Sequence, residues 1–172
     1  NQEEKRGLFK IDWNIADGHR LSLRYDKTKS EQPNLNGYST SSTSPSLSLS
    51  SYWFTKHRED SQWVLNTYDE WNDSFSTEGS FSYSKYDASP TVATRQPQVR
   101  VYTNGTITGN TITGPSVNLG EEEFRHYNIL GIRSYNGFFA GTWNVGDHSI
   151  KAGLDYQRDE FYNLFGRTEF GA

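Results

Sequence analysis

The sequence predicts an all-β chain, an antiparallel up-and-down meander, and three observations support this prediction. Apolar and polar residues alternate with a period of two along most of the chain, as in strands with one apolar and one polar face. Short turns rich in Asp, Asn and Gly separate successive alternating runs. Aromatic residues make up 15% of the 172 residues although only 33% are hydrophobic, so the chain buries rings without the apolar content of an ordinary globular core.

The first two strands are expected at residues 7–15 and 19–30, joined by a tight turn at Asp17-Gly18, because Asp and Gly tolerate positive φ. One face of this hairpin is apolar: Phe9, Ile11, Trp13, Ile15, Leu21, Leu23 and Tyr25. The other face is polar and charged: Lys10, Asp12, Asn14, Arg20, Ser22, Arg24 and Asp26. The alternation therefore predicts a sheet with two different environments.

Residues 47–71 are expected to form the third strand and residues 75–88 the fourth. The fourth strand alternates clearly, with Phe75, Phe81 and Tyr83 on one face and serines on the other. The third contains a charged middle, His57-Arg58-Glu59-Asp60, which leaves two alternatives open. Residues 47–71 form either one long strand or a hairpin with its turn near residues 58–61.

The last two strands are expected at residues 127–144 and 148–164, with a turn at Val145-Gly146-Asp147. Phe139, Gly141 and Trp143 alternate with Ala140 and Thr142 before that turn. Ile150, Ala152, Leu154 and Tyr156 alternate with Lys151, Asp155 and Gln157 after it. This hairpin repeats the pattern of the first one.

Three Trp-Asn pairs, Trp13-Asn14, Trp71-Asn72 and Trp143-Asn144, each precede a short turn. Three tryptophans at one height are typical of one rim of an aromatic belt at a membrane interface. Tyr25, Tyr83 and Tyr156 follow at a distance of ~20–30 Å along the outgoing strands, where the opposite rim is expected. The pattern therefore predicts a segment of a transmembrane β-barrel, with lipid at its apolar face and a wet lumen at its polar face.

The barrel interpretation favours one long strand over residues 47–71, because an even number of strands must separate turns that lie on the same side. The charged middle of that strand would then rise above the bilayer or form a bulge. Long polar segments at residues 31–46 and 88–122 give long loops at the end opposite the short turns, which is the asymmetry of outer-membrane barrels. Single-chain bacterial barrels have at least eight strands, so six strands suggest a piece of a longer polypeptide.

Few residues have the type and spacing of a metal-binding or catalytic site. His57, Glu59 and Asp60, or Glu121-Glu122-Glu123 with His126, could bind a metal, but solvated charged loops are the favoured interpretation. Asp147-His148 fits turn geometry. The chain has no Cys, no phosphate-binding or hydrolase motif and no basic stripe, and its net charge is −4. No catalytic, metal or cofactor residues are therefore assigned, and neither an enzyme nor a nucleic-acid partner is expected.

Two groups of residues are candidates for binding, although no ligand-binding site is assigned. The expected lumen wall carries charges of both signs, which are expected to form cross-strand pairs: Lys10, Asp12, Arg20, Arg24, Asp26, Glu78, Lys151 and Asp155. The expected outer loops carry aromatic residues that could contact a ligand outside the cell: Tyr38, Tyr52, Trp53, Phe54 and Tyr102.

Several runs resemble barrel strands of TonB-dependent receptors, most closely the Oar-like proteins with a carboxypeptidase-regulatory-like N-terminal domain. These runs are residues 10–25 (KIDWNIADGHRLSLRY), 71–78 (WNDSFSTE), 123–126 (EFRH), 146–156 (GDHSIKAGLDY) and 162–165 (YNLF). The resemblance covers most of the chain except the two long loops. It implies a barrel of about 22 strands with a plugged lumen, energised through TonB. Residues 1–172 show neither a plug domain nor a recognisable energy-coupling box.

The function implied by this resemblance is uptake of a large, scarce solute across the bacterial outer membrane. The expected partners are outer-membrane lipid, the plug domain, the TonB system and an extracellular solute of unknown identity. The alternative is an interaction protein, either an outer-membrane adhesin or a soluble carbohydrate-binding β-sandwich.

Overall fold

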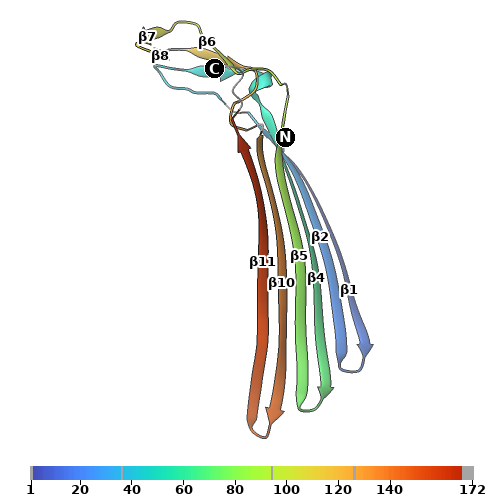
Figure 1. The fold of residues 1–172 in the computed structure, drawn as a ribbon. Coiled ribbons are helices and arrows are strands. Elements are labelled where there is room, and N and C mark those ends of the chain that lie inside the picture. The colour runs from blue at the N-terminus through green and yellow to red at the C-terminus, as the bar shows by residue number, and fades with distance from the viewer. Residues whose placement is uncertain (1, 36, 94, 126, 168–172) are drawn as a thin grey trace.

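Six long antiparallel strands form one sheet in the computed structural model, which describes residues 2–35, 37–93, 95–125 and 127–167. The order of the strands is β1-β2-β4-β5-β10-β11, so each strand pairs with the next long strand along the chain (Figure 1). Their bounds are Glu3–Ala16 (β1), His19–Asn34 (β2), Phe54–Asn72 (β4), Phe75–Val92 (β5), Tyr127–Val145 (β10) and His148–Gly166 (β11). The predicted all-β meander of about six strands is confirmed.

The third predicted strand is one strand, but it begins later than expected. β4 keeps one register with β2 from Phe54 to Asp69 and with β5 from Phe54 to Glu70, so the charged residues 57–60 form neither a turn nor a bulge. The only register shift along β4 lies beside its turn, between Glu70 and Asn72. The hairpin alternative is therefore wrong, and of the two outcomes expected for the charged middle, the bulge does not occur. Residues 47–53 belong to the loops, because backbone bonds to another loop draw them away from the sheet.

The short turns all lie at one end of the sheet, and each extends beyond the previous one (Figure 1). The amide of Glu70 donates to the carbonyl of Gly18, so the second turn at Asp73-Ser74 lies further along. The amide of Asn144 donates to the carbonyl of Ser74, so the third turn at residues 146–147 lies further still. A stagger of about one residue per strand corresponds to a tilt of ~40°. This is the tilt that closing a sheet into a barrel requires.

The long connections at the other end pack together into a loop module, which we define as residues 37–53 and 95–125. It contains β3 (Ser46–Ser48), a 3₁₀ turn η1 (Ser50–Tyr52), β6 (Val99–Tyr102), β7 (Thr106–Thr108), β8 (Thr111–Thr113) and β9 (Ser116–Leu119). β3 and β6 flank β9 in a small sheet, and the β3–β9 pair is parallel. The long loops expected from the sequence are therefore present, but they are structured and joined to each other.

The long sheet has no enclosed apolar core. Among the described residues, the buried hydrophobic side chains are Tyr52 and Phe54, at the loop end, and Ala140 in the sheet. Large apolar side chains along the strands stay exposed, up to 81% for Leu154. No helix in the described part of the chain is long and apolar enough to cross a bilayer. The apolar face thus needs an apolar environment outside the chain.

Candidate functional site

The apolar face of the sheet forms a band that ends in aromatic side chains on the loop side. Strand register places five aromatic residues in one row across the sheet: Phe9, Tyr25, Trp63, Tyr83 and Tyr135. The Tyr25 and Trp63 rings lie 4.3 Å apart, and the Tyr83 and Tyr135 rings 5.1 Å apart. Aromatic side chains therefore mark the loop-side limit of the band as a continuous row.

The other limit of the band lies beside the short turns. Trp13, Trp71 and Trp143 are about equally exposed there. The Trp71 indole donates to the Thr77 hydroxyl at 2.9 Å, and the His19 ring packs against it edge-on at 5.0 Å. Eight residues separate the two aromatic limits on β4, which is ~26 Å along the strand and ~20 Å along the axis of a tilted barrel. This height approaches the apolar band of membrane barrels.

Tyr25 and Tyr83 lie in the loop-side row as the sequence predicted, but Tyr156 lies opposite Gly137, two residues nearer the turn. The prediction also left out Phe9, Trp63 and Tyr135. Val64 follows Trp63 on the opposite face of β4, because successive side chains point to opposite sides of a strand. An apolar residue on the polar face interrupts the visible alternation. The even spacing from Trp63 through Leu65 to Trp71 is the signal that could have identified Trp63.

The polar face carries the charged residues predicted for the lumen, but their pairing differs from the prediction. Lys10 pairs with Asp12, and Arg24 with Asp26, along their own strands at 2.8 and 3.2 Å. Other contacts do cross between strands: Lys151 pairs with Glu78 across β10, Arg24 donates to Gln62, and Arg20 lies over the Tyr68 ring. The prediction of cross-strand pairs is therefore right only in part.

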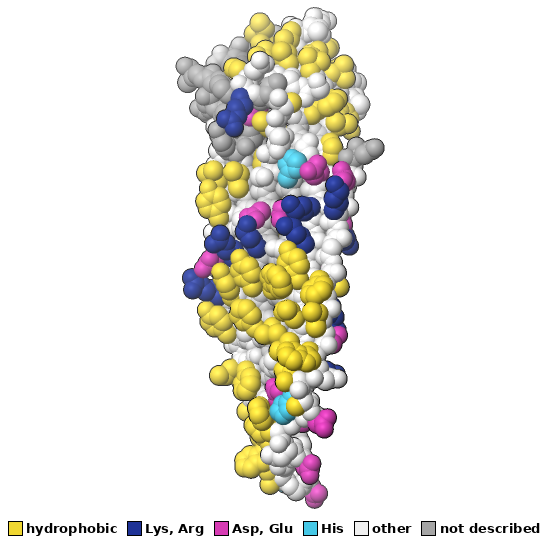
Figure 2. Space-filling view, turned by 90° about the vertical axis from the view of Figure 1, so that its right-hand side faces the viewer, with side chains coloured by type: hydrophobic (Ala, Val, Ile, Leu, Met, Phe, Trp, Pro, Cys, Tyr) yellow, Lys and Arg dark blue, Asp and Glu magenta, His cyan; other side chains and the backbone are white. Residues whose placement is uncertain are grey.

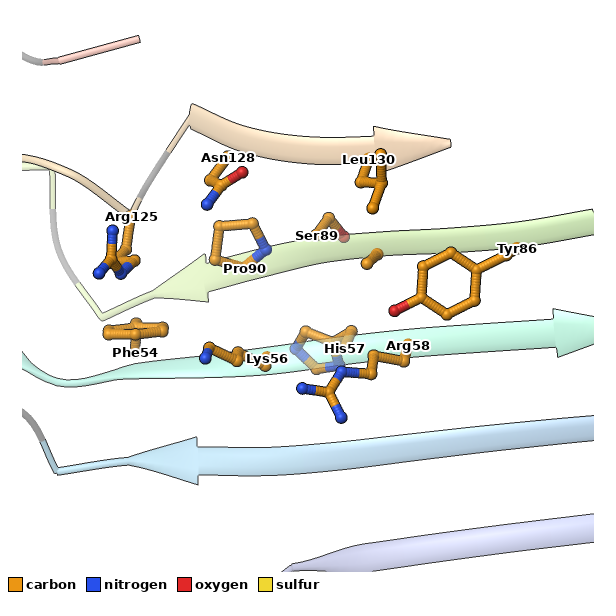
Figure 3. A pocket seen from close by; sticks show the side chains of 11 residues that line it. Phe54, Lys56, His57, Arg58, Tyr86, Ser89, Pro90, Arg125, Asn128 and Leu130 are labelled. Atoms are coloured by element: carbon orange, nitrogen blue, oxygen red, sulfur yellow. The ribbon is translucent and has the colours of Figure 1, made fainter. Parts of the chain in front are cut away.

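A cationic pocket lies at the loop end of the polar face, and we call it the mouth pocket (Figure 3). Its volume is ≈ 200 Å³, and its lining includes Phe54, Lys56, Arg58, Tyr86 and Arg125. Two neutral residues, Gln32 and Pro90, stand opposite Lys56, and Ser30 and Ala88 stand opposite Arg58. The pocket thus combines three cations with two aromatic rings, and the strands beside β4 place no carboxylate opposite its Lys56 and Arg58.

A family model described as "Outer membrane beta barrel domain" matches residues 1–172. The chain belongs to this family. No curated protein and no solved structure matches it. The chain is therefore a bacterial outer-membrane barrel domain whose apolar band contacts membrane lipid. In such barrels the short turns face the periplasm and the long loops face the outside, so the polar face lines the lumen and the loop module lies outside.

Two of the aromatic residues predicted in the outer loops are not available for a ligand. Tyr52 is 7% exposed and Phe54 is 4% exposed, because they pack inside the loop end of the molecule. Burial and the neighbouring Glu122 raise the pKa of Tyr52, whereas Arg100 opposes this rise. Tyr38 and Trp53 are exposed as predicted, and Tyr102 is half-buried.

The acidic segment of the outer-membrane barrel domain is not the solvated loop that the sequence suggested. Glu121 and Glu122 are both buried, and burial raises the pKa of Glu122. The Phe124 amide partly compensates by donating to the Glu122 carboxylate at 3.1 Å. His126, the fourth member of the predicted cluster, lies outside the described residues.

The second predicted acidic cluster also separates in the structure. Glu59 pairs with Lys27 and Lys29 on the lipid-facing side, and His57 faces Glu31 at 3.4 Å. Asp60 points to the lumen side, because adjacent residues of a strand alternate. No group of three or more metal-ligating side chains occurs among the described residues.

Proposed function

We propose that this outer-membrane barrel domain is part of a TonB-dependent receptor that takes up a large, scarce solute. The observation that carries the proposal is the mouth pocket, where the lumen-facing side chains of β4 and β5 meet the loop module. A solute that enters the lumen from outside passes this end of the barrel. In Figure 1 the loop module also leans away from the apolar side shown in Figure 2, that is, toward the lumen side.

The pocket's chemistry favours a solute that carries negative charge and flat apolar or hydroxylated groups. Lys56, Arg58 and Arg125 provide positive charge in one cavity, and cavity walls concentrate such a field. Tyr86 offers a ring surface beside these cations, whereas the buried Phe54 ring closes the loop end of the pocket. An anionic nutrient complex too large for passive diffusion fits this combination.

The unpaired edge strands of the sheet are a reason to propose a barrel with more strands. β1 and β11 are the edge strands, with 14 and 19 residues. Unpaired backbone groups cost several kcal/mol each in lipid, so both edges require strand partners in the membrane. We propose that residues 1–172 form part of one barrel domain, that further strands close it, and that a separate plug domain fills its lumen and links it to TonB.

An outer-membrane adhesin is the competing function, whereas a soluble β-sandwich is excluded by the fold. A sandwich buries its apolar faces between two packed sheets, but here a single long sheet leaves its apolar face exposed. Exposed apolar side chains on the loop module, such as Tyr38 and Ile107, suit adhesion. The experiment below separates adhesion from transport.

The test compares cells that carry the protein with cells that lack its gene or lack TonB, grown on limiting nutrients. We expect mass spectrometry of the medium to reveal an anionic solute that only the intact cells deplete. The double variant Lys56→Gln/Arg58→Gln should slow this depletion at an unchanged surface level of protein. The lipid-facing double variant Lys85→Gln/Arg133→Gln, with the same charge change, should not. Unchanged depletion together with weakened surface attachment would establish the adhesin instead.

A further inference from the structure

One of the three cations in the mouth pocket is held in place differently from the other two. Lys56 and Arg58 lie on β4, where pairing with β2 and β5 fixes the backbone that carries them. Arg125 lies instead in a turn at residues 123–125, in the segment that leads into β10 (Figure 3). Because Arg125 belongs to no strand, its position in the pocket depends on the contacts that hold this turn.

The loop module provides one set of these contacts. The Glu123 amide donates to the side-chain oxygen of Gln98 at 3.2 Å. The Phe124 amide donates to the carboxylate of Glu122 at 3.1 Å. These bonds fix the backbone of the turn up to Phe124, the residue before Arg125.

Arg167, the residue that follows β11, provides the second set of contacts. β10 and β11 stay paired as far as Tyr127 and Gly166, which brings Arg167 beside the turn although the two are far apart in sequence. The Arg167 guanidinium donates to the Glu123 carboxylate at 2.8 Å. It also lies over the Phe124 ring, 4.9 Å from the ring centre. One side chain at the end of the sheet therefore binds two consecutive residues of the turn.

The surroundings of Arg167 favour a strong contact. A surface ion pair usually contributes little, because ordering two flexible side chains offsets their attraction. Here the Glu123 side chain is only 28% exposed, and Gln98 already holds its backbone. The flat guanidinium can bond a carboxylate and cover the Phe124 ring at the same time. Arg167 is therefore suited to fixing the turn, although it does not itself line the pocket.

We propose that Arg167 is the positioning residue of the mouth pocket. It holds the turn so that the Arg125 guanidinium is already in place when an anionic group binds beside Lys56 and Arg58. The inference rests on the proposed function of this pocket, the binding of an anionic solute. A site whose groups are fixed in advance loses less conformational entropy on binding, so the effect of Arg167 appears in the affinity for the anion.

The test uses sulfate as the anionic probe, because sulfate keeps its charge at neutral pH and accepts the same charge-assisted hydrogen bonds as a carboxylate or a phosphate group. Phenylglyoxal modifies guanidinium groups, and a bound anion slows this reaction. Mass spectrometry of peptides from the intact protein in detergent therefore measures sulfate binding at Arg58 and at Arg125 separately. We expect sulfate to protect both arginines in the wild type. In Arg167→Gln the sulfate concentration for half-protection of Arg58 should rise roughly fivefold, and protection of Arg125 should stay incomplete at saturation.

Positioning and simple electrostatics predict opposite results for Glu123→Ala. Removal of this carboxylate makes the surroundings of the pocket more positive, so a purely electrostatic influence would tighten sulfate binding. Positioning predicts binding about as weak as in Arg167→Gln, because Arg167 loses its partner in the turn. Arg158→Gln is the matched control: it removes the same charge from β11, but Arg158 pairs with Glu160 rather than with the turn. This control should bind sulfate like the wild type.

A double variant completes the test. In an Arg125→Gln background, Arg167→Gln should change the half-protection concentration at Arg58 by less than about twofold, because the side chain that it positions is gone. Equal sulfate binding by the wild type and Arg167→Gln, or tighter binding by Glu123→Ala, would overturn the proposal while the pocket remained an anion site. Absence of protection at both Arg58 and Arg125 in the wild type would remove the anion site itself, and with it both the proposed role of the pocket and this inference.

Discussion

A few buried residues join the two outer loops into one module. The Asn118 side chain connects them through hydrogen bonds: its amide donates to the Gly37 carbonyl at 3.0 Å and to the Ser48 hydroxyl at 3.3 Å. Arg100 donates to the Asn118 side-chain oxygen at 2.8 Å. Residues separated by about eighty positions thus share one hydrogen-bond network, and a buried network of this kind fixes a single arrangement when every member is satisfied.

Gly37, beside this network, is expected to tolerate substitution poorly. Its φ is +85°, and an added Cβ would come within 2.3 Å of the Ser48 hydroxyl and 2.5 Å of the Tyr52 ring. Gly37→Ala should therefore open the module and expose it to limited proteolysis. Gly109→Ala is the matched control, because Gly109 also has a positive φ, +58°, but has nothing within 4 Å of its Cβ position. Equal protease sensitivity of the two variants would contradict the crowding argument.

The raised pKa of Glu122 predicts that the module is more stable in mild acid than at neutral pH. A carboxyl whose pKa is raised by folding stabilises the folded state fully below its unfolded value, 4.5. That contribution disappears as pH rises through the higher folded value. Glu122→Gln keeps an acceptor for the Phe124 amide but removes the charge, so it should stabilise the module at neutral pH.

Hydrogen exchange of residues 120–125 between pH 4 and pH 7 measures this effect. We expect protection in the wild type to fall as pH rises, after correction for intrinsic exchange, and protection in Glu122→Gln to stay nearly constant. The same decline in both proteins would show that another group titrates. The sequence could not predict this behaviour, since three consecutive glutamates suggest a solvated loop and only contacts with distant segments bury two of them.

The strands were predictable because each has one apolar and one polar face. Alternation located five of the six long strands and the three short turns, and it separated the lipid-facing from the lumen-facing side chains. The third strand was expected instead because the short turns must lie on one side. The outer ends of β2 and β5 were predicted too short, because these strands continue through Pro33 and Pro90 to Asn34 and Val92. Proline lacks an amide donor and normally ends a central strand, but these prolines lie near the loop end, where water can satisfy the neighbouring carbonyl groups.

Alternating exposure along β2 can be measured with single cysteines, because the chain contains none. A membrane-impermeant maleimide should label Ser22→Cys and Thr28→Cys in the folded protein, since both positions lie on the polar face. Leu21→Cys and Leu23→Cys lie in the apolar band and should react only after denaturation. Similar labelling rates at Ser22 and Leu23 in lipid vesicles would show that β2 does not separate water from lipid.

The whole sheet follows from two facts that act together: every strand repeats the same two faces, and each turn extends beyond the last. Alternation alone allows a flat sheet, but a stagger of about one residue per strand tilts the strands and lets the sheet curl into a barrel. The stagger depends on pairing between strands that are distant in sequence, such as Trp143 opposite Phe75. The sequence therefore predicted the two environments, whereas the register and the parallel pairing of the outer loops required the structure.

Because one face of the sheet meets lipid and the other meets water, a charged side chain should lower the unfolding free energy far more at one residue of a strand than at the next. Phe81 lies in the apolar band between Leu65 and Gly137, and Ser80 lies on the lumen side between Asn66 and Phe138. An arginine facing lipid costs about 2–4 kcal/mol at the membrane midplane of a barrel and less toward the interfaces. Phe81 lies one lipid-facing position inside Tyr83, so Phe81→Arg should carry part of this cost together with the lost apolar contacts, whereas Ser80→Arg keeps its charge in water and stands near Glu78.

Denaturant unfolding of the intact protein in phospholipid vesicles measures both variants on one scale. We expect Phe81→Arg to lose at least 2 kcal/mol of unfolding free energy and Ser80→Arg to lie within about 1 kcal/mol of wild type. Phe81→Ala separates the lost ring from the added charge, because it removes the ring without placing a cation in lipid. If Phe81→Arg and Phe81→Ala are equally stable, the face does not contact lipid, and the outer-membrane arrangement of the sheet is wrong.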